Sequence, residues 1–348
     1  MTAGPVCPVP IASYPRVLLA HGGGGRLTHT LIRDLFAAAF DNPALAPLHD
    51  GAILDLAGAR IALTTDSFVI TPRFFPGGDI GSLAVHGTVN DLAMCGARPA
   101  ALTVGFVIEE GLDMDELARV VASMRRAAAE AGVPIVTGDT KVVDRGKGDG
   151  LYVNTTGIGV VLEGASISPR AAMPGDIVLV NGGIAEHGIA VMSVREGLEF
   201  GTTLVSDSAA LHGLIADLIA AAGPAVHVLR DPTRGGVSSA LNEIAESSGA
   251  GIRLEESAIP ISEPVRGACE ILGLDPLYVA NEGKVIAIVA RETADAALAA
   301  LRAHPLGRRA AVIGAVTAEH PGRVVMRSLT GGMRVVDMLS GEQLPRIC

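Results

Sequence analysis

Residues 59–66 (ARIALTTD) and residues 133–139 (VPIVTGD) are two short apolar runs that each end on an aspartate. Both are rich in aliphatic residues and are bounded by polar or turn-forming ones, which predicts two strands. Between them, residues 113–131 predict a helix, because Asp113 can cap it and apolar residues then recur at helical spacing. A further strand is expected at 150–161, GLYVNTTGIGVV. This half of the chain is therefore expected to form a sheet packed with helices.

The second half repeats this mixture after a segment rich in Ser, Pro and Gly at 164–176, GASISPRAAMPGD. The closing residues, SGEQLPRIC, carry no periodicity and indicate a tail. The chain is thus predicted to have an α+β fold with two sheets. In this half, strands are expected at 176–183 and 284–290, and helices at 188–196, 208–222, 237–249 and 293–303.

The composition excludes several classes of protein. The 348 residues carry 27 Lys and Arg against 37 Asp and Glu, a net charge of -10, with no basic stripe, so no nucleic-acid binding is expected. No apolar run of about 18 residues occurs, which predicts no membrane span, and the N-terminus lacks the pattern of a signal peptide. The four cysteines form no CxxC pair, which argues against a disulfide framework or a zinc site and favours the cytoplasm.

Four consecutive glycines, Gly22, Gly23, Gly24 and Gly25, follow His21 and precede a short helical pattern. Without Cβ atoms their N–H groups can approach a ligand closely, as a phosphate cradle near a helix N-terminus requires. The segment is not a P-loop, because no Lys-Ser/Thr pair follows at the required spacing. A flexible linker explains the composition equally well.

Three aspartates stand at or near the ends of expected elements. Asp66 and Asp139 close strands, and Asp91, in GTVNDLAMCG, is expected near the start of a helix. Carboxylates at element ends can converge in space, and Mg²⁺ prefers such hard oxygen ligands when it bridges an acidic site to phosphate. Each aspartate can equally cap a turn or a helix. Three of them beside Gly- or Thr-rich turns favour the metal.

Three further polar segments are candidates for chemistry. Lys141, after Asp139 and Thr140, could neutralise phosphate or transfer a proton, although an exposed loop of mixed charge explains it as well. Residues 231–236, DPTRGG, lead into a helix and suit an anion, or form a plain strand-to-helix turn. Glu282, in NEGK, is either a general base or a salt-bridged surface residue.

The last residue, Cys348, ends the sequence PRIC. Its thiolate would be a strong nucleophile with little steric protection, although its own α-carboxylate should raise the thiol pKa. Eight extended residues span on the order of 26 Å, so a swinging arm could bring the sulfur into the protein's own active site or to another protein. An incidental cysteine in a frayed tail remains the alternative.

Taken in order, these motifs resemble the HypE family of hydrogenase maturation factors, which are carbamoyl dehydratases of the aminoimidazole ribonucleotide synthetase-like (PurM-like) superfamily. The resemblance runs from about residue 21 to the terminal cysteine. It is carried by HGGGGRL, the stretch from TTDSFVITPRFF to NDLAMCGARP, VTGDTKVVDRGKGDGLYVNTTGIG, RDPTRGGVSSALNEIA, DPLYVANEGK and PRIC.

The resemblance implies a two-domain fold in which each domain is a β-sheet packed with helices, with the N-terminal sheets pairing across a homodimer. It gives a flexible lead-in at 1–20, an N-terminal ATP-binding and dimerisation domain at 21–164, a C-terminal domain at 165–338 and a flexible tail at 339–348.

The resemblance also implies the chemistry. Cys348 would receive a carbamoyl group from the carbamoyltransferase HypF, and ATP would drive its dehydration to a thiocyanate. The cyano group would pass to iron on the HypC–HypD complex, for the active site of [NiFe]-hydrogenase.

Site residues follow from the same resemblance. Cys348, Lys141 and Glu282 would be catalytic, the last two by shuttling protons. Asp66, Asp91 and Asp139 would hold Mg²⁺. The positions expected to bind ATP are Gly22, Gly23, Gly24, Gly25, Asp66, Asn90, Thr140, Asp231 and Gly235.

Two other functions fit parts of the pattern. A selenophosphate synthetase or a small-molecule kinase would share the scaffold, but the former keeps its reactive residue near the glycine loop, and Cys7 lies in an unrelated Pro-rich context. A non-catalytic scaffold could use the tail only to dock a partner, with nucleotide as a structural ligand.

Overall fold

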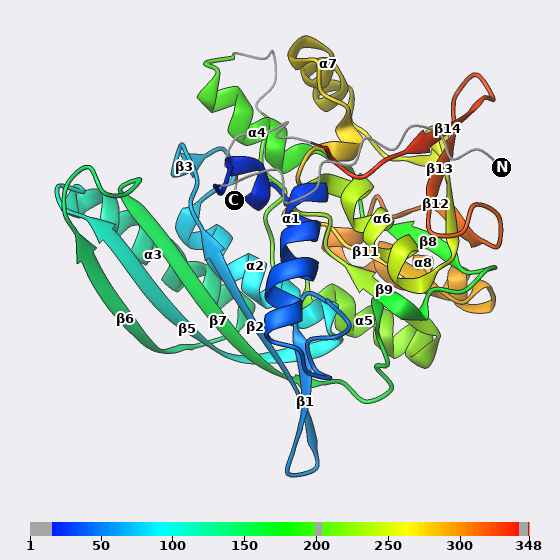
Figure 1. The fold of residues 1–348 in the computed structure, drawn as a ribbon, viewed down its shortest axis with the longest axis horizontal. Helices are drawn as coiled ribbons and strands as arrows, with labels where there is room; N and C mark the ends of the chain where they lie inside the picture. The colour runs from blue at the N-terminus through cyan, green and yellow to red at the C-terminus, as the bar shows by residue number, and fades with distance from the viewer. Residues whose placement is uncertain (1–15, 199–203, 341–346, 348) are drawn as a thin grey trace.

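Two sheets, each packed with helices, make up the computed structural model of this protein (Figure 1). The structure describes residues 16–198, 204–340 and 347. Cys348, Cys7, most of the expected lead-in and most of the expected tail lie outside the described residues. The α+β architecture with two sheets is confirmed.

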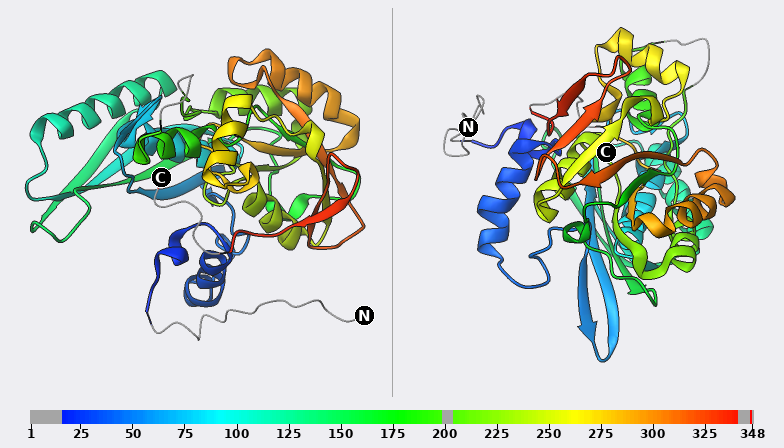
Figure 2. Two further views of the ribbon diagram at one scale, coloured as in Figure 1. Left: turned by 90° about the horizontal axis from the view of Figure 1, so that it is seen from above. Right: turned by 90° about the vertical axis from the view of Figure 1, so that its right-hand side faces the viewer.

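The N-terminal sheet has five strands in the order β1-β2-β7-β5-β6. Only β5 and β6 run parallel, and a helix, α3, provides the crossover between them. Figure 2 shows α2 and α3 together on one side of this sheet. The elements are β1 (Ala52–Leu56), β2 (Ala59–Phe68), β5 (Ala97–Glu109), β6 (Ile135–Val143), β7 (Leu151–Val161), α2 (Ile80–Met94) and α3 (Met114–Ala131).

The other face of the N-terminal sheet is not covered by a helix of its own domain in the described part of the chain. Leu63 on β2 and Ile158 and Val160 on β7 alternate with buried neighbours and remain exposed there. Apolar side chains on the outer face of a sheet indicate a surface suited to contact with another body. We call this surface the open face.

The C-terminal sheet has seven strands in the order β14-β13-β10-β12-β8-β11-β9. Alternate residues of its central strands pack on α6 on one face and on α5 and α8 on the other, so the sheet is buried on both sides. The elements are β8 (Ile177–Val180), β9 (Val226–Arg230), β10 (Gly251–Glu255), β11 (Ile286–Val289), β12 (Ala311–Thr317), β13 (Val324–Arg327), β14 (Met333–Val336), α4 (Glu186–Arg195), α5 (His212–Ala222), α6 (Gly236–Ser248), α7 (Glu263–Leu272) and α8 (Ala294–Ala303).

Shorter elements connect these layers. The N-terminal segment forms α1 (Arg26–Leu31), which continues as a π-helical segment, η3 (Ile32–Ala37). Its first residue, Arg26, donates its N–H to the carbonyl of Leu339, just after β14. The small hairpin of β3 (Phe74–Phe75) and β4 (Gly78–Asp79) precedes α2. Single 3-10 turns are η2 (Leu19–Gly22), η4 (Pro169–Ala171), η5 (Gly223–Ala225), η6 (Glu256–Ala258), η7 (Pro276–Tyr278), η8 (Arg291–Thr293) and η9 (Pro305–Gly307). None of the helices in the described ranges has the length and apolar character to cross a membrane.

Local capping accounts for the element that the sequence predicts best. The Asp113 side chain accepts hydrogen bonds from the N–H groups of Asp115 and Glu116, which fixes the start of α3. Gly132 ends the helix in the left-handed conformation, with φ of 67°. The chain then enters β6 directly.

Two expected helix starts are wrong. The helix expected from residue 208 begins at His212, as α5. Asp91 does not lie near a helix start; α2 begins at Ile80, capped by Asp79, and Asp91 is in its last turns. Two strands also continue past the aspartates expected to close them, since β2 ends at Phe68 and β6 at Val143. Consequently Lys141 lies in a strand rather than in a loop.

Candidate active site

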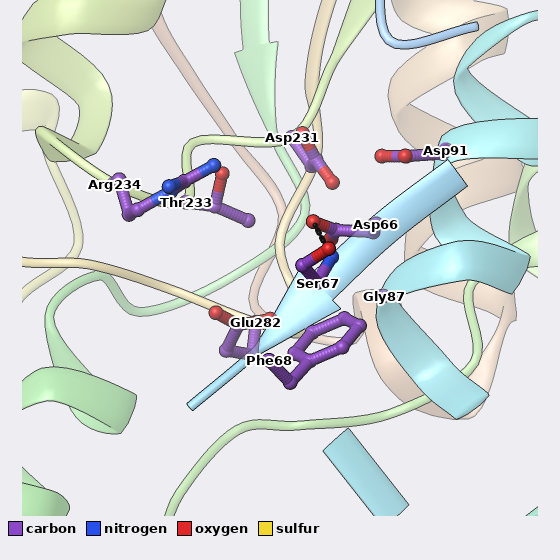
Figure 3. A pocket seen from close by; sticks show the side chains of 9 residues that line it. All are labelled: Asp66, Ser67, Phe68, Gly87, Asp91, Asp231, Thr233, Arg234 and Glu282. Atoms are coloured by element: carbon purple, nitrogen blue, oxygen red, sulfur yellow. Dashed lines mark hydrogen bonds between the residues drawn. The ribbon is translucent and has the colours of Figure 1, made fainter. Parts of the chain in front are cut away.

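A pocket opens where the two sheets meet, and acidic side chains dominate its wall (Figure 3). Strand β2, helix α2, the turn after β9 and the loop before β11 each contribute to it. Figure 3 shows the carboxylates of Asp66, Asp91 and Asp231 directed toward one another. The lining residues are Asp66, Ser67, Phe68, Gly87, Asp91, Asp231, Thr233, Arg234 and Glu282.

A carboxylate cluster beside this pocket has the composition of a metal site. Oxygens of Asp50, Asp91 and Asp231 all lie within 4.8 Å of one another. The Thr64 hydroxyl donates to Asp91 Oδ2 at 2.7 Å, which orients that carboxylate. Asp50 is the member that the sequence did not reveal. It lies in the loop before β1, and its only signal is a His-Asp-Gly turn of a common kind.

Burial disfavours the ionised form of these carboxylates. Desolvation raises the pKa of Asp91 well above its usual range, and the neighbouring charges of Asp231 and Asp66 raise it further. Desolvation likewise raises the pKa of Asp231 well above its usual range, with Asp50 adding to the effect. The pKa of Asp66 is raised by the same cause. Such a group of close carboxylates is stabilised by a cation.

The donor set fits Mg²⁺. Among the described residues, Asp50 Oδ2 is buried without a hydrogen-bond partner, and His49 Nδ1 lies 3.4 Å from it, so its lone pairs are available to a ligand. All the nearby donors are hard carboxylate oxygens, which Mg²⁺ prefers over nitrogen or sulfur. The residues that could hold the ion are therefore Asp50, Asp66, Asp91 and Asp231.

Two arginines limit the negative charge at the rim. Arg230 pairs with Asp50 at 2.5 Å and with Glu243 at 2.6 Å. Arg234 lines the pocket itself and donates from Nη1 to the carbonyl of Gly22 at 3.0 Å. The hydrogen bond from Arg234 to Gly22 joins the 231–236 turn to the glycine loop.

The glycine loop uses its four residues in two ways. A Cβ at Gly24, whose φ is 72°, would overlap Arg234, and a Cβ at Gly25 would overlap the carbonyl of Leu339. These two glycines are therefore required by internal packing. A Cβ at Gly22 would meet no atom within 4 Å, and one at Gly23 only a carbonyl at 3.8 Å. Packing does not explain Gly22 and Gly23, so they remain candidates for ligand contact.

Gly235 also lies where the 231–236 turn meets the glycine loop. Its φ is 79°, and an added Cβ would lie 2.7 Å from the carbonyl of Gly24. The two glycine segments that the sequence singled out thus pack backbone against backbone. Asp231 opens this turn and points into the pocket.

Glu282 is held by its backbone and presents its carboxylate to the pocket. Asn90 Nδ2 donates to the Glu282 carbonyl at 3.0 Å, and the Glu282 N–H donates to Asp207 Oδ1 at 3.1 Å. Lys284 fixes Asp207 in turn, with Nζ 3.0 Å from Oδ2. In the described part of the chain, Glu282 Oε1 is buried without a hydrogen-bond partner. Desolvation first, and then the charges of neighbouring aspartates, raise the pKa of Glu282 well above its usual range.

Asn90, expected to contact the nucleotide, is fully engaged with the protein. Besides Glu282, its Nδ2 donates to the carbonyl of Ala209 at 3.0 Å, and its Oδ1 accepts from the N–H of Leu211 at 2.7 Å. All three partners belong to the C-terminal half. Asn90 therefore ties α2 to the loops that carry Glu282.

Strand β6 keeps three expected site residues away from this pocket. Asp139, Thr140 and Lys141 are exposed. Ser67 at the pocket pairs with Asn154 on β7, Asn154 pairs with Gly105 on β5, and Gly105 pairs with Asp139 on β6, so Asp139 lies three strands across the sheet from Ser67. At about 4.8 Å per strand, that separation is roughly 14 Å. Asp139 and Lys141 both project onto the open face, because side chains alternate along a strand.

The end of the chain reaches the same region. Ile347 is 4% exposed and packs in one apolar cluster with Phe68 of the pocket wall and with Ala280. Its carbonyl lies 2.7 Å from His187 Nε2. No pattern in the sequence predicts this contact.

Two family models match this chain: AIR synthase related protein, N-terminal domain, over residues 48–161, and the C-terminal domain of the same family over residues 173–327. Among curated proteins, carbamoyl dehydratase HypE of Azotobacter vinelandii is 57% identical over 332 residues, covering 95% of this chain and 97% of the relative.

Solved structures agree with this likeness. A HypE–HypF complex matches with a TM-score of 0.85 and 50% identity, covering 89% of this chain and 99% of the matched chain. HypE in complex with ATP matches with a TM-score of 0.81 and 54% identity, covering 96% and 100%. This chain therefore belongs to the carbamoyl dehydratase HypE family of AIR synthase related proteins.

Proposed function

We propose that this protein is an ATP-dependent carbamoyl dehydratase that converts an S-carbamoyl group on its own Cys348 into a thiocyanate. The observation that supports this most is that the penultimate residue, Ile347, packs in one apolar cluster with Phe68, which lines the acidic pocket. Cys348 follows that residue by one peptide bond. A kinase for a small molecule would not need its own C-terminus beside its pocket.

The reaction removes the elements of water from the carbamoyl group. When bound, Mg-ATP supplies the phosphoryl group that turns the carbamoyl oxygen into a phosphate leaving group. The sulfur of Cys348 keeps its bond to carbon throughout. The carbon–oxygen bond breaks, two N–H protons leave, and the nitrogen lone pairs complete the C≡N bond. The products are the protein thiocyanate, ADP, phosphate and released protons.

Glu282 is the proposed proton acceptor. Its carboxylate has a buried oxygen without a partner among the described residues, and burial raises its pKa, which makes it a stronger base than an exposed glutamate. Because Asp207 and Asn90 hold its backbone from both sides, the carboxylate needs little reorganisation to reach a substrate nitrogen.

Asp50, Asp66, Asp91 and Asp231 are the proposed ligands of Mg²⁺. Bound there, the ion would offset the repulsion between these carboxylates and the triphosphate. Gly22 and Gly23 are proposed to contact the phosphates, since internal packing does not demand glycine at either position.

Asp139, Thr140 and Lys141 are proposed to act through a homodimer. They border the open face, whose apolar side chains favour pairing with the same face of a second copy. Such pairing would enclose the exposed charges of β6. We keep Lys141 as a second proton-transfer group and Asp139 as a metal ligand on this basis.

The proposed partners follow from the family. HypF would deliver the carbamoyl group, in line with the solved HypE–HypF complex, and the HypC–HypD complex would accept the cyano group on its iron. The reaction is proposed to take place in the cytoplasm, where a terminal thiol stays reduced.

Mass spectrometry of the C-terminal peptide tests the proposal. After incubation with HypF, carbamoyl phosphate and ATP, we expect Cys348 to carry a carbamoyl group and then to lose the mass of one water as ATP is hydrolysed. Cys348→Ala should bind nucleotide normally and accept no carbamoyl label. Carbamoyl label on the Ala variant would show that another residue is the carrier.

A further inference from the structure

His187 is a buried histidine that the proposed chemistry does not use. It lies in the first turn of α4 (Glu186–Arg195) and is 0% exposed. The imidazole of His187 packs on the ring of Phe75 in an edge-to-face arrangement, with ring centroids 5.3 Å apart and planes at 89°. A buried imidazole must satisfy both ring nitrogens, so their partners identify its role.

The partners of His187 fix the position of its proton. Nε2 lies 2.7 Å from the carbonyl oxygen of Ile347, which can only accept a hydrogen bond, so Nε2 carries the proton and donates. Burial lowers the pKa of His187, which favours the neutral ring. Nδ1 is therefore an acceptor, and the Ser206 hydroxyl, 2.8 Å away, donates to it.

Ser206 is itself held in place. Its N–H donates to the carbonyl of Pro76 at 2.8 Å, and its hydroxyl oxygen accepts from the N–H of Ser208 at 3.1 Å. A directional series of hydrogen bonds thus runs from Ser208 through Ser206 and His187 to the carbonyl of Ile347. These hydrogen bonds hold the His187 ring in one orientation, so its Nε2–H is already directed at the position of the Ile347 carbonyl.

The side chain of Ile347 completes the contact. It is buried in an apolar cluster that includes Phe75, against which His187 packs, and Phe68, which lines the acidic pocket. Recognition therefore has two parts: a hydrogen bond to the backbone carbonyl and burial of a branched aliphatic side chain. Neither part involves the sulfur of the following residue.

We propose that His187, Ser206 and Phe75 form a receptor site for the penultimate residue of the chain, which docks the C-terminus at the acidic pocket whatever group Cys348 carries. The proposal rests on the proposed function only in taking Cys348 as the carrier. It makes His187 a positioning residue, because it touches the tail and not the reacting atoms. Leaving the site would strip the buried Nε2–H of its acceptor, so the docked state is favoured until a partner captures the tail.

Alkylation of Cys348 by iodoacetamide, followed by mass spectrometry of the C-terminal peptide, tests the receptor site directly. In His187→Phe, which keeps the ring volume and loses the N–H, we expect the alkylation rate to rise about tenfold. His187→Gln can place an N–H near the position of Nε2 and should restore most of the protection. ATP affinity should be unchanged in both variants, which checks that the pocket has folded.

Turnover gives a second, independent reading. Carbamoylation of His187→Phe by HypF should proceed at the normal rate or faster, because the transferase needs the released tail. Dehydration of the carbamoylated variant should slow by about tenfold, because docking precedes it. A failure of Cys348→Ala to lose carbamoyl label would overturn the carrier assignment instead, so the two failures are distinguishable.

Ile347→Ala guards against a folding defect in the histidine variants, since it changes only the docked side chain. It should also raise the alkylation rate. Unchanged alkylation and dehydration in Ile347→Ala, or in a His187→Phe variant that binds ATP normally, would overturn the receptor site.

Discussion

The acidic pocket and strand β6 hold the same kinds of side chain in opposite surroundings. In the pocket, Asp66, Asp91 and Glu282 come from elements of both halves and are shielded from solvent. On β6, Asp139 and Lys141 lie on an edge strand, exposed on the open face. What packs on the face of a strand therefore decides whether its aspartate is enclosed in a pocket, and this pocket forms where the two sheets meet.

The largest expected effect separates the two proposed proton-transfer groups. Glu282→Gln should slow dehydration about 10²–10⁴-fold while leaving ATP affinity unchanged, because it removes a desolvated base and keeps the shape. Lys141→Gln should cost less, since an exposed ammonium is stabilised by water. Single-turnover rates from carbamoylated protein measure both. Equal losses would mean that β6 is as much a part of the catalytic site as the pocket is.

A smaller effect is expected for metal binding. Asp91→Asn should weaken Mg-ATP binding by about tenfold or more, because it removes an anionic oxygen from the cluster. Asp139→Asn, the matched change on β6, should have a lesser effect. Calorimetric titration with ATP at saturating Mg²⁺ gives both affinities. If Asp139→Asn proves the more damaging, the metal is not held where Asp50, Asp91 and Asp231 converge.

The smallest expected effect concerns stability. Asp91, Asp231 and Glu282 have pKa values raised by burial, so between their unfolded and folded pKa values the folded protein binds more protons. Metal-free protein should then lose stability as pH rises from about 4 through these folded values. Mg²⁺ should reduce that loss, by a few degrees in Tm, since it stabilises the ionised carboxylates.

Thermal melts in EDTA and in Mg²⁺ from pH 5 to 8 measure this difference. Asp91→Asn should show a shallower dependence on pH in EDTA, because one of the ionising groups is gone. Identical pH profiles for the wild type and Asp91→Asn would contradict the burial of charge in the cluster.

The sequence predicted most of the pocket but not its assembly. Asp66, Asp91, Asp231 and Glu282 could be chosen because each lies in a polar motif between apolar segments. Asp50 could not, because a His-Asp-Gly turn is common and only the fold brings it within 4.8 Å of the others. His187 was missed for a similar reason, since its partner is 160 residues away.

The misplaced start of α2 has a physical cause as well. Helix α2 is buried on nearly every side, including Leu83, Val85 and Leu92, so its sequence lacks the apolar stripe that marks a surface helix. Its glycines also lower its intrinsic helix propensity. Helix α3, which has one buried and one exposed face, was predicted within a residue of its ends.

Asn90 and Asp91 are neighbours on α2, and their side chains have different partners. Asn90 joins the helix to Ala209, Leu211 and Glu282 by three hydrogen bonds, while Asp91 contributes to the carboxylate cluster. The proposed base and the proposed metal ligands are thus held in one rigid unit. The two domains cannot move apart at this point without breaking the three hydrogen bonds of Asn90. Ligand exchange at this pocket would then depend on small movements of the glycine loop, whose Gly22 carbonyl accepts a hydrogen bond from Arg234 of the pocket wall, and would need no parting of the two domains.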